Sequence, residues 1–169
     1  DKLAQRADIF IDQGYFTPAQ AQVYLQKAKN LGLELCLHTE QLHRTEGFKL
    51  GLAIQAQSMD HLVQINDNDI EQIKNSNTTA VLLPSADFYL KMKYPPARKL
   101  IDSGVRVAIS TDFNPGTSPS SDISFVGVLS RLNMNMSLPE TLVAYTLGAA
   151  HALGLENQIG SLEVGKSCD

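Results

Sequence analysis

Apolar segments recur along this chain at nearly constant intervals, and each ends on a polar residue or a proline. The ends fall at His38, His61, Pro84 and Asp112, which are 23, 23 and 28 residues apart. Segments with the apolar periodicity of helices lie between them, so the repeating unit is one strand followed by one helix. A series of such units predicts a parallel sheet with right-handed crossover connections.

Local patterns predict where the individual elements begin and end. Thr17-Pro18-Ala19-Gln20 combines an N-cap threonine, a proline for the first helical turn and a capping-box glutamine, and it predicts a helix that stops at Gly32. Asn66-Asp67-Asn68-Asp69 predicts another helix start. We expect strands at 7–12, 33–38, 78–84 and 105–112, a brief strand that ends at 61, and further helices at 47–56, 95–104, 121–134 and 138–155.

The expected fold class is α/β, either an open doubly wound sheet or a (β/α)₈ barrel. No Gly-rich loop lies between a strand and a helix start, which weakens the case for a nucleotide-binding open sheet. The absence of that loop therefore favours the barrel. Hydrophobic residues make up 43% of the chain, which suffices for a packed core.

Charge and composition exclude several functional classes. The net charge is −4 and no basic run is present, so nucleic acid is not an expected partner. No apolar run approaches the roughly 20 residues of a membrane helix, and the first residues lack the apolar stretch of a secretory signal. Two cysteines, Cys36 and Cys168, are too few for a disulfide framework. We expect a soluble, cytoplasmic protein that binds neither nucleic acid nor membrane.

Polar residues at the strand ends are candidates for a metal site. In a (β/α)₈ barrel the catalytic residues project from the carboxyl ends of the strands. His38, His61 and Asp112 occupy such positions, and two histidines with a carboxylate suit zinc or iron. A lone histidine at a strand end is more often a hydrogen-bonded rim residue, and Asp112 could simply cap the loop Asn114-Pro115-Gly116. Spacing alone leaves both interpretations open.

Four longer runs carry a resemblance to a known family. The runs 35–41, 58–62, 80–84 and 110–119 (LCLHTEQ, SMDHL, AVLLP and STDFNPGTSP) resemble, in that order, the imidazolonepropionases of the amidohydrolase superfamily. The segment TLGAAHALGL at 146–155 and the tail IGSLEVGK at 159–166 resemble the usual ending of superfamily members. The resemblance covers essentially all 169 residues, and the run from Asp112 to Pro119 is its most specific part.

The resemblance implies a set of site residues and a reaction. It implies that His38 and Asp112 bind one zinc or iron ion, and that His61 and Asp112 take part in catalysis. It implies substrate contacts by Gln41, Asn114, Gly116 and Thr117. The implied reaction is metal-dependent hydrolysis of the ring C–N bond of 4-imidazolone-5-propanoate to N-formimidoyl-L-glutamate. In that chemistry a metal makes water acidic enough to lose a proton near neutral pH.

The sequence departs from the family in one large respect. Amidohydrolases also take metal ligands from a His-x-His pair on the first barrel strand, and this chain has none. Five expected strands also fall short of eight. We therefore expect the C-terminal half of such an enzyme: a partial barrel over 1–156, and at 157–169 the start of a return to a small β-sandwich domain.

A partial barrel has consequences for activity and association. We expect the chain alone to be inactive, and we expect it to pair with the missing N-terminal half or with itself, because open sheet edges and an exposed barrel interior favour association. Two alternative functions stay open. One is another amidohydrolase, such as a cyclic amidase or a deaminase, and the other is a catalytically inactive half-barrel that serves as an interaction module.

Overall fold

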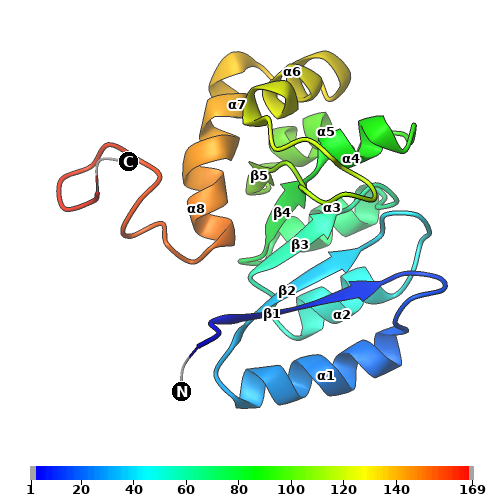
Figure 1. Ribbon diagram of the computed structural model, residues 1–169. Coiled ribbons are helices and arrows are strands. Elements are labelled where there is room, and N and C mark those ends of the chain that lie inside the picture. The colour runs from blue at the N-terminus through cyan, green and yellow to red at the C-terminus, as the bar shows by residue number, and fades with distance from the viewer. Residues whose placement is uncertain (1–2, 168–169) are drawn as a thin grey trace.

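A five-stranded parallel sheet forms the centre of the protein (Figure 1). The computed structural model describes residues 3–167. Each strand pairs only with its neighbours along the chain, in the order β1-β2-β3-β4-β5, whereas the strand order of a doubly wound sheet reverses. This order agrees with consecutive strands of a barrel. The strands are β1 (Arg6–Ile11), β2 (Glu34–Thr39), β3 (Ser58–His61), β4 (Thr79–Leu82) and β5 (Val107–Ile109).

Helices connect the strands, and several begin where the sequence predicts. The capping box at Thr17 and the helix start at Asn66 form as expected, and capping boxes that were not predicted form at Asn66 and Ser137. Within residues 3–167 no helix has the length and apolar character that a membrane crossing requires. The helices are α1 (Pro18–Asn30), α2 (Gly47–Ala53), α3 (Asp67–Lys74), α4 (Pro84–Tyr89), α5 (Ala97–Asp102), α6 (Ile123–Asn133), α7 (Leu138–Val143) and α8 (Ala149–Ala152), with a π-helical turn η1 (Ala144–Gly148) between the last two.

Several boundaries differ from the sequence prediction. Helix α2 ends at Ala53 and not at 56, and α5 spans Ala97–Asp102 and not 95–104. The fourth strand ends at Leu82, and Pro84 begins α4, a helix that the sequence analysis did not predict. Proline suits the first turn of a helix because backbone N–H groups in that turn have no helical partner, so the N–H that proline lacks is not missed. The fifth strand ends at Ile109, so Asp112 lies in the following loop, with a φ of 51°. The helix expected at 138–155 is interrupted by η1 and ends at Ala152.

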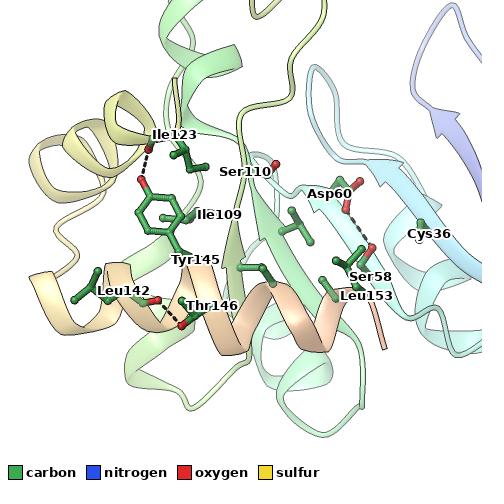
Figure 2. Close-up of a pocket in the computed structure, with 14 residues that line it drawn as sticks. Cys36, Ser58, Asp60, Ile109, Ser110, Ile123, Leu142, Tyr145, Thr146 and Leu153 are labelled. Atoms are coloured by element: carbon green, nitrogen blue, oxygen red, sulfur yellow. Dashed lines mark hydrogen bonds between the residues drawn. The ribbon is translucent and has the colours of Figure 1, made fainter. Parts of the chain in front are cut away.

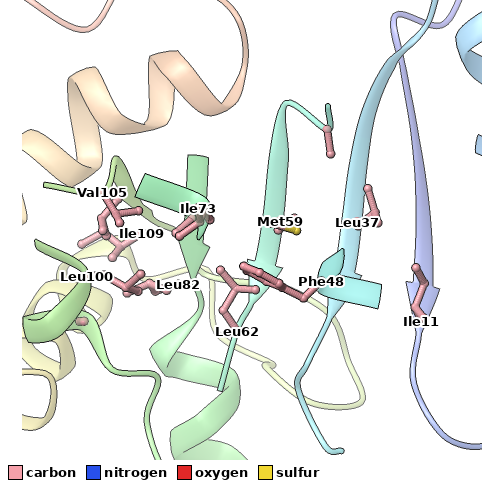
Figure 3. Close-up of a cluster of buried hydrophobic side chains, with 14 of the residues drawn as sticks. Ile11, Leu37, Phe48, Met59, Leu62, Ile73, Leu82, Leu100, Val105 and Ile109 are labelled. Atoms are coloured by element: carbon pink, nitrogen blue, oxygen red, sulfur yellow. The ribbon is translucent and has the colours of Figure 1, made fainter. Parts of the chain in front are cut away.

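The two faces of the sheet carry different side chains because neighbouring strand residues point in opposite directions. One face, here called the outer face, is apolar and is covered by helices (Figure 3). Its strand residues are Ile9, Ile11, Leu35, Leu37, Met59, Ala80, Leu82, Val107 and Ile109, all buried. The opposite face, here called the inner face, carries Asp8, Phe10, Cys36, His38, Asp60 and Val81, which are half-buried or exposed.

The segment α7–η1–α8 lies beside β5, at one edge of the sheet (Figure 1). Gly148 permits the close approach, because a Cβ atom there would stand only 2.1 Å from the backbone oxygen of Val107. Gln57, directly before β3, donates a hydrogen bond from Nε2 to the backbone oxygen of His151. Residues 153–167 form turns and extended chain, and Cys168 and Asp169 lie outside the described residues.

Candidate active site

His38 and His61 come together from two adjacent strands. The strands β2 and β3 pair with Thr39 opposite His61, which brings the two histidines to the same end of the sheet. Alternation alone would place His61 on the outer face with Met59, but a φ of 74° at His61 turns the chain at the end of β3. The ring centroids of His38 and His61 lie 4.0 Å apart, and the His38 ring also stacks on Phe10 at 3.6 Å.

Burial keeps both imidazoles neutral at pH 7. Loss of hydration lowers the pKa of His38 to about 4, although its hydrogen bond with Gln41 acts in the opposite direction. Burial, together with the neighbouring His38, lowers the pKa of His61 to about 2. A neutral imidazole retains a lone pair that can bind a metal or accept a hydrogen bond.

The nitrogens of His61 lack partners within the described chain. His61 is only 1% exposed, and neither Nδ1 nor Nε2 makes a hydrogen bond to residues 3–167. Buried polar groups in native proteins are nearly always paired, so an unpaired pair of ring nitrogens indicates a position where a ligand or another group binds.

Gln41 contacts His38 from the loop that follows β2. Its Oε1 lies 2.6 Å from Nε2 of His38, and the side chain of Gln41 is almost fully buried. This contact brings one predicted substrate-binding residue directly against one predicted metal ligand. It uses the Nε2 nitrogen of His38, one of the two ring nitrogens that could bind a metal.

Asp112 is separated from the histidine pair. Burial raises the pKa of the Asp112 carboxyl to about 6. Among residues 3–167 no three His, Cys, Asp or Glu side chains lie close enough to hold a metal ion, so the structure does not join Asp112 to His38 and His61 in one ligand cluster. Asp112 stands three residues beyond the end of β5, not on the strand as the sequence analysis expected, and β5 is not adjacent to β2 or β3 in the sheet.

The other predicted substrate residues form a compact turn directly after Asp112. Oδ1 of Asn114 accepts hydrogen bonds from the backbone N–H groups of Gly116 (3.0 Å) and Thr117 (2.7 Å). Nδ2 of Asn114 donates to the backbone oxygen of Asp112 at 2.8 Å and to Oγ1 of Thr117 at 2.8 Å. The side chain of Asn114 therefore shapes this loop and holds it against Asp112.

Two further acidic groups near these residues were missed by the sequence analysis. Asp87 on α4 is fully buried, and neither of its carboxylate oxygens has a hydrogen-bond partner among the described residues. Burial and the nearby charge of Asp112 raise its pKa to about 7. Burial and the charge of Asp8 raise the pKa of Asp60 to about 7 as well. The sequence offered one signal for Asp87, which is an acidic residue shortly after the apolar run that ends at Pro84. The signal was missed because helix α4 was not expected there.

A cavity of about 670 Å³ lies between the inner face and the segment α7–η1–α8 (Figure 2). Ser58 and Asp60 meet on its sheet side, where the hydroxyl of Ser58 donates to Oδ1 of Asp60 at 3.3 Å. His38, His61 and Asp112 do not line it. Its other labelled lining residues are Cys36, Ile109, Ser110, Ile123, Leu142, Tyr145, Thr146 and Leu153. The cavity and the histidine pair are thus separate features of this chain.

Sequence comparisons identify proteins to which this chain is similar. Residues 14–169 match the profile of the amidohydrolase family. An imidazolonepropionase of Bdellovibrio bacteriovorus is 54% identical over 168 residues, which are 99% of this chain and 40% of that protein. An imidazolonepropionase of Bacillus velezensis is 41% identical, again over 99% of this chain and 40% of its own length. The chain spans about 40% of the length of these relatives.

Solved structures share the fold at low sequence identity. An adenosine deaminase of Xanthomonas campestris with bound zinc superposes with a TM-score of 0.76 and 24% identity, covering 92% of this chain and 40% of that protein. A Xaa-Pro dipeptidase with bound methionine gives a TM-score of 0.77 and 19% identity, over 99% of this chain and 48% of that one. These likenesses concern the fold alone.

Proposed function

The chain belongs to the amidohydrolase family, and we propose that it forms part of an imidazolonepropionase. The proposed reaction is hydrolysis of the ring C–N bond of 4-imidazolone-5-propanoate to N-formimidoyl-L-glutamate. The observation that carries the proposal is 54% identity to the Bdellovibrio imidazolonepropionase over 99% of this chain. Because the chain spans 40% of that relative, we propose that the active enzyme also contains the rest of the barrel and that this chain alone is inactive.

A zinc or iron ion fits the types of residue present. We propose that His38 and Asp112 hold it, beside His61, once the rest of the barrel is present, because within residues 3–167 alone these side chains do not form one ligand cluster. The two unpaired, buried nitrogens of His61 support this assignment, since they lie against His38 and make no bond to the described chain. The adenosine deaminase of Xanthomonas campestris, a solved structure with a similar fold, contains zinc. When bound, such a metal supplies Lewis acidity that allows water to lose a proton near neutral pH.

In the proposed reaction, Asp112 would transfer protons and His61 would stabilise the developing negative charge. The carboxylate of Asp112 takes the proton of the attacking water and returns it to the ring nitrogen that leaves, which balances the hydrolysis. The neutral imidazole of His61 donates a hydrogen bond to the carbonyl oxygen as negative charge develops there. Its burial excludes water that would otherwise weaken that bond.

Gln41 and the turn from Asn114 to Thr117 would orient the substrate. Gln41 is held against His38, and its amide can contact a ring bound beside that histidine. The turn presents hydroxyl and backbone groups next to Asp112, where they can bind the polar atoms of the propanoate chain. Orientation of this kind raises the rate because the reacting atoms meet in a productive geometry.

The proposal can be tested with a joined enzyme. In this enzyme the chain is fused to the portion of the Bdellovibrio relative that it does not match, and the product is identified by mass spectrometry. We expect turnover of 4-imidazolone-5-propanoate, loss of turnover on chelation, and recovery with zinc or iron, which identifies the metal. The Bdellovibrio enzyme serves as the positive control.

Failure of a correctly folded joined enzyme, with the control active, would contradict the proposal. A panel of other cyclic amides and of amino-substituted heterocycles then separates a different amidohydrolase from an inactive interaction module, which turns over none of them.

A further inference from the structure

A buried carboxylate at the end of β1 makes contacts that the proposed mechanism does not use. The side chain of Asp12 has 0% exposure, and its oxygens accept four hydrogen bonds. Oδ1 accepts from the backbone N–H of Gln13 at 2.7 Å and from Nδ1 of His43 at 2.8 Å. Oδ2 accepts from the backbone N–H of Leu42 at 2.9 Å and from that of His43 at 3.4 Å. Three of these bonds cross to the loop after β2, some thirty residues further along the chain.

That loop, residues 40–45, is also held by hydrogen bonds within it and by a residue after β3. The buried carboxylate of Glu40 accepts from the backbone N–H and the hydroxyl of Thr45, at 3.0 and 3.1 Å. Gln64 after β3 donates from Nε2 to the backbone oxygens of Gln41 (3.1 Å) and Leu42 (3.2 Å). The chain needs these anchors, because it leaves β2 through a φ of 54° at Glu40, a conformation that costs energy for a residue with a side chain.

The loop places one functional side chain. Gln41 lies between Glu40 and Leu42, and its amide oxygen is 2.6 Å from Nε2 of His38. We propose that Asp12 is a positioning residue: its carboxylate fixes the loop 40–45 so that Gln41 is held at His38 in the orientation that contacts substrate. This inference rests on the proposed function, in which Gln41 binds the substrate.

A carboxylate is required at position 12 for a specific chemical reason. The backbone N–H groups of Leu42 and His43 both point at Oδ2, and the backbone N–H of Gln13 and Nδ1 of His43 point at Oδ1. Asparagine has nearly the same shape, but its amide nitrogen only donates, so it sets a donor against a donor at one of the two positions. A buried N–H that loses its acceptor destabilises the arrangement around it. The loop would then release Gln41 while the sheet stays intact.

A double-mutant cycle in the joined enzyme tests this link. We expect Asp12→Asn to lower kcat/KM by about 10–100-fold, as loss of an outer partner of a site residue does. In a Gln41→Ala background, we expect the same substitution to change kcat/KM by no more than about twofold, because Asp12 then has no functional side chain to position. Metal content is measured for every variant, and it should remain that of the unsubstituted enzyme. His43→Ala is the matched control: it removes one side-chain contact and leaves the backbone bonds to Oδ2, so kcat/KM should stay within about twofold.

A second measurement does not depend on activity. Hydrogen exchange followed by mass spectrometry should show protected amides in peptides that cover residues 40–45, and Asp12→Asn should abolish that protection. Full, independent losses from Asp12→Asn and Gln41→Ala would overturn the positioning role while leaving the proposed function in place. Unprotected amides in the unsubstituted protein would overturn it as well. An inactive joined enzyme with a protected loop would instead contradict the proposed function.

Discussion

The outer and inner faces of the sheet differ in how they are covered and in which side chains they carry. The outer face is closed by the chain's own helices, and its strand residues are buried, Leu37 and Met59 completely. The inner face carries the titratable side chains His38 and Asp60 and borders a cavity of about 670 Å³. In a (β/α)₈ barrel the inner face is the barrel interior, which side chains from all eight strands fill. The outer face therefore contributes stability, and in the proposed function the inner face with its rim carries the chemistry.

The largest expected effect is on chemistry at the rim. In the joined enzyme, Asp112→Asn should lower kcat/KM by about 10²–10⁴-fold, because the amide cannot take the proton of water. Its thermal unfolding temperature should hardly change, since Asp112 is only half-buried and lies in a loop. Asp122→Asn is the matched control in the same loop region: Asp122 caps α6, and asparagine caps a helix equally well. Equal activity of the two variants would remove Asp112 from the mechanism.

The next effect is on the stability of the outer face. Leu37→Ala should lower the free energy of unfolding of the joined enzyme by about 2–5 kcal/mol, through lost burial and the cavity that remains. Leu37 is fully buried against Met59 and the helix layer (Figure 3). Cys36→Ala, one residue away on the inner face, removes a smaller side chain and should cost much less. Urea unfolding measures both, and similar losses at the two positions would show that the faces do not differ.

The third expected effect is a pH dependence of the free energy of unfolding that arises from Asp60 on the inner face. Burial raises the pKa of Asp60 from 3.8 to about 7, so the folded state binds this proton more tightly than the unfolded state does. Stability from this group is fully present below about pH 4 and is lost as pH rises through 7, with a slope of at most about 1.4 kcal/mol per pH unit. Asp60→Asn should flatten this part of the urea-unfolding profile. A profile unchanged by the substitution would mean that Asp60 titrates normally.

Local patterns predicted the helix starts, and the strand spacing predicted the histidine pair. Thr17 and Asn66 carry their capping information within four residues, so their helices could be predicted without any tertiary contact. His38 and His61 could be paired because adjacent parallel strands bring their carboxyl ends together.

Features that depend on contacts between distant parts of the chain, or on where strand pairing ends, could not be predicted from the sequence. Asp12 reads as the polar end of a strand, and its role appears only when the loop at Leu42 and His43 packs against it. Helix α4 was missed because Val81-Leu82-Leu83-Pro84 resembles a buried strand up to its last residue. Asp112 was placed on a strand because apolar residues precede it, yet strand pairing ends at Ile109.

The smallest effect tests whether the outer layer depends on local helix signals. Thr17→Ala removes the side-chain acceptor for the N–H of Gln20 at the start of α1 and should cost about 1 kcal/mol. That is less than the loss expected for Leu37→Ala, because α1 is also held by Ala21, Leu25 and Ala28, which are buried. Thr17→Ser keeps the acceptor and serves as the control. A loss for Thr17→Ala as large as for Leu37→Ala would mean that the outer layer depends on the capping of its helices as much as on its apolar core.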